Sequence, residues 1–120
     1  MFFAASDNDD IRRKLASITK EPKIFQYLLD HENDPRVLGL MAINKNLPDQ
    51  QYLELLNKFA DNKNPPDEMV DIIELLLARK RTPKEFIRFF IDSNNEHLSS
   101  LAKQKIQTEA SKFLLTKLMF

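Results

Sequence analysis

The sequence predicts an all-α protein, a short right-handed α-solenoid of about seven helices in three to four hairpin repeats. The first observation is a recurrence: an aliphatic residue is followed by Ala and, five or six positions later, by a Pro that opens a new apolar run. Successive alanines of this pattern stand 26, 36 and 24 residues apart, and such a period is typical of stacked helical repeats. The second observation is apolar spacing of three and four residues, with no sustained strand alternation. The members of the recurrence are Leu15-Ala16 with Pro22, Met41-Ala42 with Pro48, Leu77-Ala78 with Pro83, and Leu101-Ala102 with Thr108 in place of the proline.

Each of the six prolines lies where a helix can begin, because Pro suits the first helical position and disrupts the interior. Asp34-Pro35 supplies an N-cap and a first residue, and Thr82-Pro83-Lys84-Glu85 has the spacing of a capping box. Together with the apolar spacing, these signals predict helices over residues 7–18, 22–31, 35–44, 48–61, 66–79, 83–92 and 95–118.

The chain length of 120 residues predicts a single α-helical repeat domain, 1–120, in which the longer last helix, about 95–118, is a C-terminal cap. Short helices cannot bury an apolar stripe alone, but stacked pairs share a continuous core. The small Ala of each repeat suits a close approach of two helices. Equivalent positions in the repeats are expected in this core: Ile11, Val37 and Ile73, and Leu29, Leu55 and Phe90.

The charge balance gives no general case for binding nucleic acid or an anionic membrane surface, since 18 basic residues match 18 acidic ones. The absence of Cys fits a reducing compartment. The N-terminal sequence lacks the pattern of a secretory signal, and no stretch approaches 18 uncharged apolar residues. We therefore expect a cytoplasmic protein that does not span a membrane.

The best copy of the repeat runs from Asp34-Pro35-Arg36-Val37 through Ala42-Ile43-Asn44 to Pro48, with partial copies at 11–22 and 76–83. In these residues the chain resembles the HEAT-like and leucine-rich-repeat-variant α-solenoids. Their repeats read as an Asp turn, a short helix with Val-Arg and Ala, an Asn-bearing turn with Pro, and a Leu-rich helix. The resemblance covers roughly residues 11–103 and implies a scaffold that binds proteins, sometimes nucleic acids, with catalysis the exception.

Residues suited to catalysis are not grouped in the sequence. His31 and His97 lie in different repeats without metal-ligand spacing, and each sits among polar turn residues. The carboxylates occur in open segments, and no Gly-rich loop is present to hold phosphate. We expect no catalytic residues, no metal and no cofactor, and hence no enzyme.

The strongest charge feature is a basic run formed by Arg79, Lys80, Arg81, Lys84 and Arg88. One interpretation is that its arginines complement the C-terminal end of their helix and stay hydrated. The other is that the run binds an acidic partner or a nucleic-acid backbone. Phe89, next to Arg88, is either part of the core or an exposed anchor of an interface.

Both termini are apolar, although terminal repeats usually show a polar outer face. The last predicted helix carries one apolar stripe, which Leu115, Leu118 and Met119 widen toward the end. Either the termini fold back as hydrophobic caps, or one of them docks on another subunit.

The function that these observations favour is a non-enzymatic protein–protein interaction or adaptor module. Its partner would be another protein, either a larger complex or a second copy of the chain, and no membrane. The alternative is a nucleic-acid-associated module that binds phosphate through residues 79–88.

Overall fold

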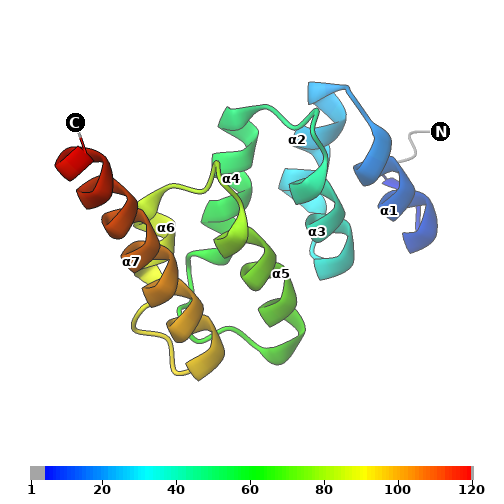
Figure 1. Cartoon of the computed structure of the whole chain (residues 1–120). Coiled ribbons are helices and arrows are strands. Elements are labelled where there is room, and N and C mark those ends of the chain that lie inside the picture. The colour runs from blue at the N-terminus through cyan, green and yellow to red at the C-terminus, as the bar shows by residue number, and fades with distance from the viewer. Residues whose placement is uncertain (1–4, 120) are drawn as a thin grey trace. The chain divides into compact units, whose positions relative to one another are not determined.

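The computed structural model describes residues 5–119, and within them the chain forms seven α-helices and no strand. The all-helical prediction is confirmed, and each predicted helix limit lies within three residues of the observed one. The helices (Figure 1) are α1 (Asp9–Ile18), α2 (Pro22–His31), α3 (Pro35–Ile43), α4 (Asp49–Phe59), α5 (Asp67–Ala78), α6 (Lys84–Phe89) and α7 (Glu96–Met119).

The prolines mark helix starts, as predicted. Pro22 and Pro35 are the first residues of α2 and α3, and three further helices begin one residue after Pro48, Pro66 and Pro83. This placement is favourable because the first helical N–H groups have no intrahelical partner that Pro would remove.

Short polar side chains cap three of the helices. Asp34 is the N-cap of α3, and its Oδ1 accepts a hydrogen bond from the backbone N–H of Arg36 at 2.9 Å. Asn8 caps α1 in the same manner, and the Oδ1 of Asn95 accepts from the N–H of Leu98 at 3.0 Å where α7 begins. Each cap satisfies a backbone donor that the helix leaves unpaired.

Contacts within the chain divide it into two compact units, Met1–Phe59 and Ala60–Phe120. In the first unit α1 packs on α3, α2 packs on α4, and α3 also contacts α4. In the second unit α7 packs on both α5 and α6. The single repeat domain over residues 1–120 stays a prediction.

The recurring alanines divide into three buried residues and one exposed residue. Ala16, Ala42 and Ala102 are fully buried, as expected for close helix contacts. Ala78 is exposed, so the prediction of a close helix contact there is wrong. Ala78 is the last residue of α5 and lines grooves at the end of this helix.

Of the six equivalent core positions, five are buried as predicted and Ile11 is not. Its side chain is 40% exposed. Ile11 lies on a side of α1 that, with Lys14, Leu15 and Ile18, lines an open groove of about 220 Å³. The five buried positions are Leu29, Val37, Leu55, Ile73 and Phe90.

A buried amide joins the ends of α1 and α3. The Nδ2 of Asn44, at the C-terminal end of α3, donates to the carbonyl oxygens of Ala16 at 2.9 Å and Thr19 at 3.0 Å. The last carbonyls of a helix have no partner within it. Asn44, at the C-terminal end of α3, thus supplies hydrogen-bond donors to the free carbonyl groups at the C-terminal end of α1.

The ammonium group of Lys58 plays the same part between α2 and α4. It donates to the carbonyl oxygen of Leu29 and, at 3.0 Å, to that of Glu32. Burial lowers the pKa of Lys58, and the charges of Asp30 and Glu32 oppose this shift. A cation at the C-terminal end of α2 is also favoured by the helix dipole.

The buried carboxylate of Glu32 ties α1 to the turn between α2 and α3. Its Oε2 pairs with the Nε of Arg12 at 2.9 Å, and its Oε1 accepts from the backbone N–H of Asp34 at 3.1 Å. Because both oxygens are used, the burial of this charge is compensated.

We predict that Asn44→Ala lowers the free energy of unfolding by about 1–3 kcal/mol, because two buried carbonyl groups lose their donor. Urea denaturation followed by circular dichroism measures the change. Asn46→Ala is the matched control, since Asn46 lies in the same turn with an exposed side chain. Equal stability of the two variants would contradict the role assigned to Asn44.

Asp34 predicts a pH dependence. Its hydrogen bond with the Arg36 side chain lowers the pKa of Asp34 below its usual value. The stability that charged Asp34 contributes is therefore present above the ordinary pKa of about 3.9 and is lost as the pH falls through the lowered folded-state pKa.

Asp34→Asn keeps a capping side chain and removes the charge. We expect it to lower the urea midpoint at pH 7, and this difference to narrow between about pH 5 and pH 2. The control is Asp61→Asn, at an exposed position. If the urea midpoints of the wild type and Asp34→Asn differed by the same amount across this pH range, the charge of Asp34 would contribute nothing to stability.

Candidate interaction surfaces

The basic run lies around the C-terminal end of α5 and along α6. Arg79 is the C-cap of α5, and its backbone N–H donates to the carbonyl oxygen of Leu76 at 3.3 Å. Arg79 and Arg81 are half-buried. The remaining cations of the run are exposed: Lys80, Lys84 and Arg88.

Three of these cations line one groove of about 520 Å³, together with two apolar residues of α5. Lys84 and Arg88, on α6, are outside the set of residues that line it. Among the ion pairs of residues 5–119, none involves Arg79, Lys80, Lys84 or Arg88. We call this surface the basic groove; its lining consists of Leu75, Ala78, Arg79, Lys80 and Arg81.

A second groove of about 270 Å³ runs between α5 and α7 and adjoins the basic groove at Ala78. The Nζ of Lys105, on α7, lies 3.5 Å from the carbonyl oxygen of Ala78. The sequence-based prediction missed Lys105; the available signal was a lysine in register with Leu98 and Ala102 in the apolar stripe. This α5–α7 groove is lined by Glu74, Leu77, Ala78, Leu101, Gln104, Lys105 and Thr108.

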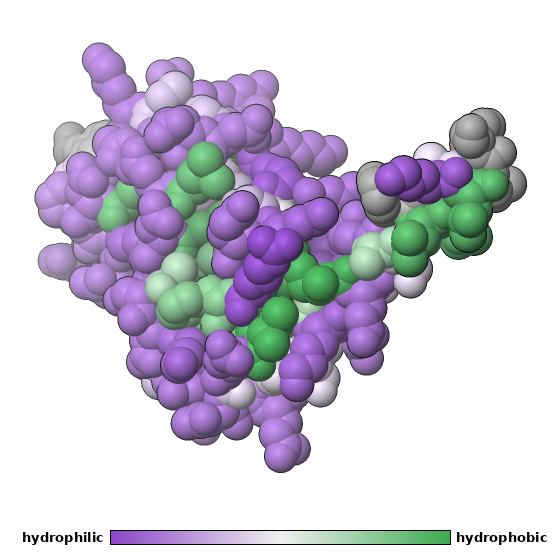
Figure 2. Space-filling model, turned by 90° about the vertical axis from the view of Figure 1, so that its left-hand side faces the viewer, coloured by the Kyte–Doolittle hydropathy of each residue, from purple (hydrophilic) through white to green (hydrophobic). Residues whose placement is uncertain are grey.

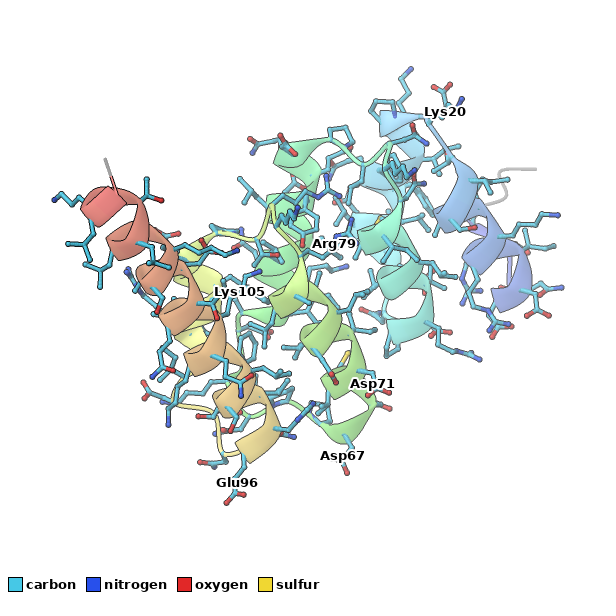
Figure 3. All side chains as sticks on the ribbon, viewed as in Figure 1. Lys20, Asp67, Asp71, Arg79, Glu96 and Lys105 are labelled. Carbon is cyan, nitrogen blue, oxygen red and sulfur yellow. The ribbon has the colours of Figure 1, made fainter. Side chains whose placement is uncertain are left out.

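The N-terminal ends of α5 and α7 form an anionic end of the second unit. The acidic Asp67, Asp71 and Glu96 lie there, whereas Arg79 and Lys105 lie farther along the two helices (Figure 3). These three acidic residues are outside the linings of both grooves, in which Glu74 is the acidic residue.

At the anionic end, the histidine of α7 joins the two helices. The Nε2 of His97 lies 3.1 Å from the Oε2 of Glu74, and both side chains are about half exposed. The surface position predicted for His97 is confirmed. His31 is exposed as well, and it stacks on Tyr27 with 4.2 Å between ring centroids.

The last turns of α7 extend past α5 and α6 (Figure 1) and carry exposed leucines. Leu114 is 58% exposed, Leu115 59% and Leu118 84%. We call these three residues the leucine face. Figure 2 shows hydrophobic side chains along this projecting part of the helix. The Met119 side chain, which the sequence places in the same set, lies outside the described residues.

The leucine face lies past the end of the buried part of α7. The buried side chains of this helix, Leu98 and Ala102, lie in its first two turns, whereas the described side chains of residues 107–118 are exposed, except for the half-buried Glu109. The sequence predicted one apolar stripe that Leu115 and Leu118 widen, and only the first part of this stripe is buried.

Phe89 belongs partly to the core. It is half-buried and meets Phe90 edge to face, with ring centroids 5.1 Å apart. Phe86 and Phe90 are buried, as predicted. The aromatic ring of Phe89 is therefore held in place by its neighbour instead of projecting as an isolated anchor.

No family model, curated protein or solved structure matches the chain. Within residues 5–119, no helix is long and apolar enough to cross a membrane, and no three His, Cys, Asp or Glu side chains are grouped to hold a metal ion.

Leucine substitutions should lower the stability of the protein much more in the packed first turns of α7 than in its projecting last turns. Leu98→Ala removes a fully buried side chain and should lower the free energy of unfolding by about 2–4 kcal/mol. Leu118→Ala, at an exposed position on the same helix, should change it by less than about 0.5 kcal/mol. Thermal and urea unfolding of both variants provide the check, and comparable losses would place Leu118 in the folded core.

Proposed function

We propose that this chain is a non-enzymatic protein–protein interaction module, built as a short HEAT-like α-solenoid. The pairing of α1 with α3 and of α2 with α4 supports the proposed repeat architecture. So does the spacing of 25 to 29 residues between Asn44 or Lys58 and the helix ends that they satisfy. The repeat family, the adaptor role and the cytoplasmic location are parts of this proposal.

The observation that carries the proposal is the leucine face. Three large exposed aliphatic side chains stand together on the last turns of α7, a helix whose first turns pack on α5 and α6. Burying one leucine is worth about 1.5–3 kcal/mol, so covering the three would stabilise a complex substantially.

The proposal is tested by affinity purification of the tagged protein from its native cell, followed by reconstitution with each captured protein. Leu114→Glu with Leu118→Glu should abolish capture and binding in the reconstituted pair, because it places charges in the apolar interface. Ser100→Glu with Ser111→Glu is the matched control, since it adds the same charges at exposed positions of α7. A partner that binds the wild type, the leucine variant and the serine control equally well would refute an interface at the leucine face.

The second candidate function is binding of a nucleic-acid backbone through the Arg79–Arg88 run. The observation that favours it is the set of four cations without an ion-pair partner among the described residues. Retention on DNA at physiological salt, lost when Arg79, Lys80 and Arg81 are replaced, would support this function, because phosphate contacts are steeply salt-dependent. Elution below physiological salt would refute it.

A further inference from the structure

The basic groove and the α5–α7 groove adjoin at Ala78, which lines both. Lys80 lines the first groove and Lys105 the second, and we call the part with these two cations the cationic end. The apolar lining of the α5–α7 groove comes from Leu101 of α7, which is partly exposed, and from Leu77 of α5, which is 2% exposed. A ligand for this surface needs negative charge at the cationic end and apolar bulk beside it.

The cations at the cationic end can bind a hydrogen-bond acceptor from a ligand. Lys80 is exposed and has no ion-pair partner among residues 5–119, and Lys105 reaches only the Ala78 carbonyl oxygen, at 3.5 Å. These two ammonium groups can therefore pair with an incoming carboxylate. The Nε of Arg79 is buried and is not itself open to a ligand.

We propose that this groove binds an acidic segment of a partner protein, in which carboxylates lie at the cationic end and an aliphatic side chain lies against Leu101. The inference rests on the proposed function, because it names the chemistry of a protein partner. The apolar lining of the groove offers nothing to a phosphate backbone, whereas it suits an aliphatic side chain. Charge complementarity and apolar walls together favour a protein segment over nucleic acid.

The test is selection from a phage-displayed library of random 15-residue peptides on the full-length protein. We expect the selected peptides to be enriched in Asp and Glu next to Leu, Ile or Phe. Titration of one such synthetic peptide should show binding weakened about tenfold by Lys80→Glu and by Lys105→Gln, and by replacement of its apolar residue with Ser.

Lys63→Glu is the matched control for charge. Lys63 is exposed and neighbours Asn64, whose Oδ1 accepts from the backbone N–H of Asn94 two residues before α7 begins, away from the basic groove. Peptides without acidic residues, peptides that bind Lys80→Glu as well as wild type, or a labelled 15-nucleotide single strand that competes for the same residues would each overturn the inference.

Failure here is separable from failure of the proposed function. If the groove inference is wrong but the chain is an interaction module, a reconstituted partner still binds the Lys80→Glu protein. Binding of that partner is then lost only in the variant with Leu114→Glu and Leu118→Glu. If the module itself is wrong, the leucine-face variant changes no interaction, whatever the peptides show.

Discussion

Hydrogen bonds that join the ends of neighbouring helices are the constraint on which this structure depends. Six of the seven helices have twelve residues or fewer, and isolated helices of this length are marginal in water. Asn44 and Lys58 each donate to carbonyl oxygens at the end of a helix that lies beside their own. These bonds fix the lateral register of the helices where apolar packing alone leaves it loosely determined.

The same constraint connects packing to the candidate surfaces. At the end of α5, Thr82 donates to the carbonyl oxygen of Leu76 at 2.6 Å, and Lys105 approaches the carbonyl oxygen of Ala78. This end is therefore satisfied partly from its own turn and partly from α7. The result is an exposed Ala78 and a groove where a buried helix contact was expected, with Lys80 and Lys105 among the residues around it.

The sequence was sufficient to predict the helices because their starts are local events. Pro at the first position and Asp34 as a cap need only their neighbours, and the observed limits follow them. The sides of a helix that are covered depend on tertiary neighbours, which a stripe of apolar residues does not identify. Ile11 and Leu118 have the spacing of core residues but are exposed, Ile11 on an open groove of α1 and Leu118 on the projecting last turns of α7.

The candidate sites could be predicted in part. The basic run was visible as a cluster of charges, and Leu115 and Leu118 as an apolar end. The groove needed Lys105 and Leu101, which lie more than twenty residues after Arg79 and meet α5 only through the packing of α7. The placement of Glu74 and Lys105 in one groove likewise depends on how α7 packs on α5 and not on either helix alone.

Amide hydrogen exchange along α7 distinguishes the packed from the free part of this helix, at a dilution where light scattering shows a monomer. We expect slow exchange over residues 96–106, which pack on α5 and α6, and fast exchange over residues 107–119, which carry the leucine face. Binding of a partner should slow exchange in the second segment. Slow exchange along the whole of α7 in the isolated monomer would show that the leucine face is already covered and is not a free interface.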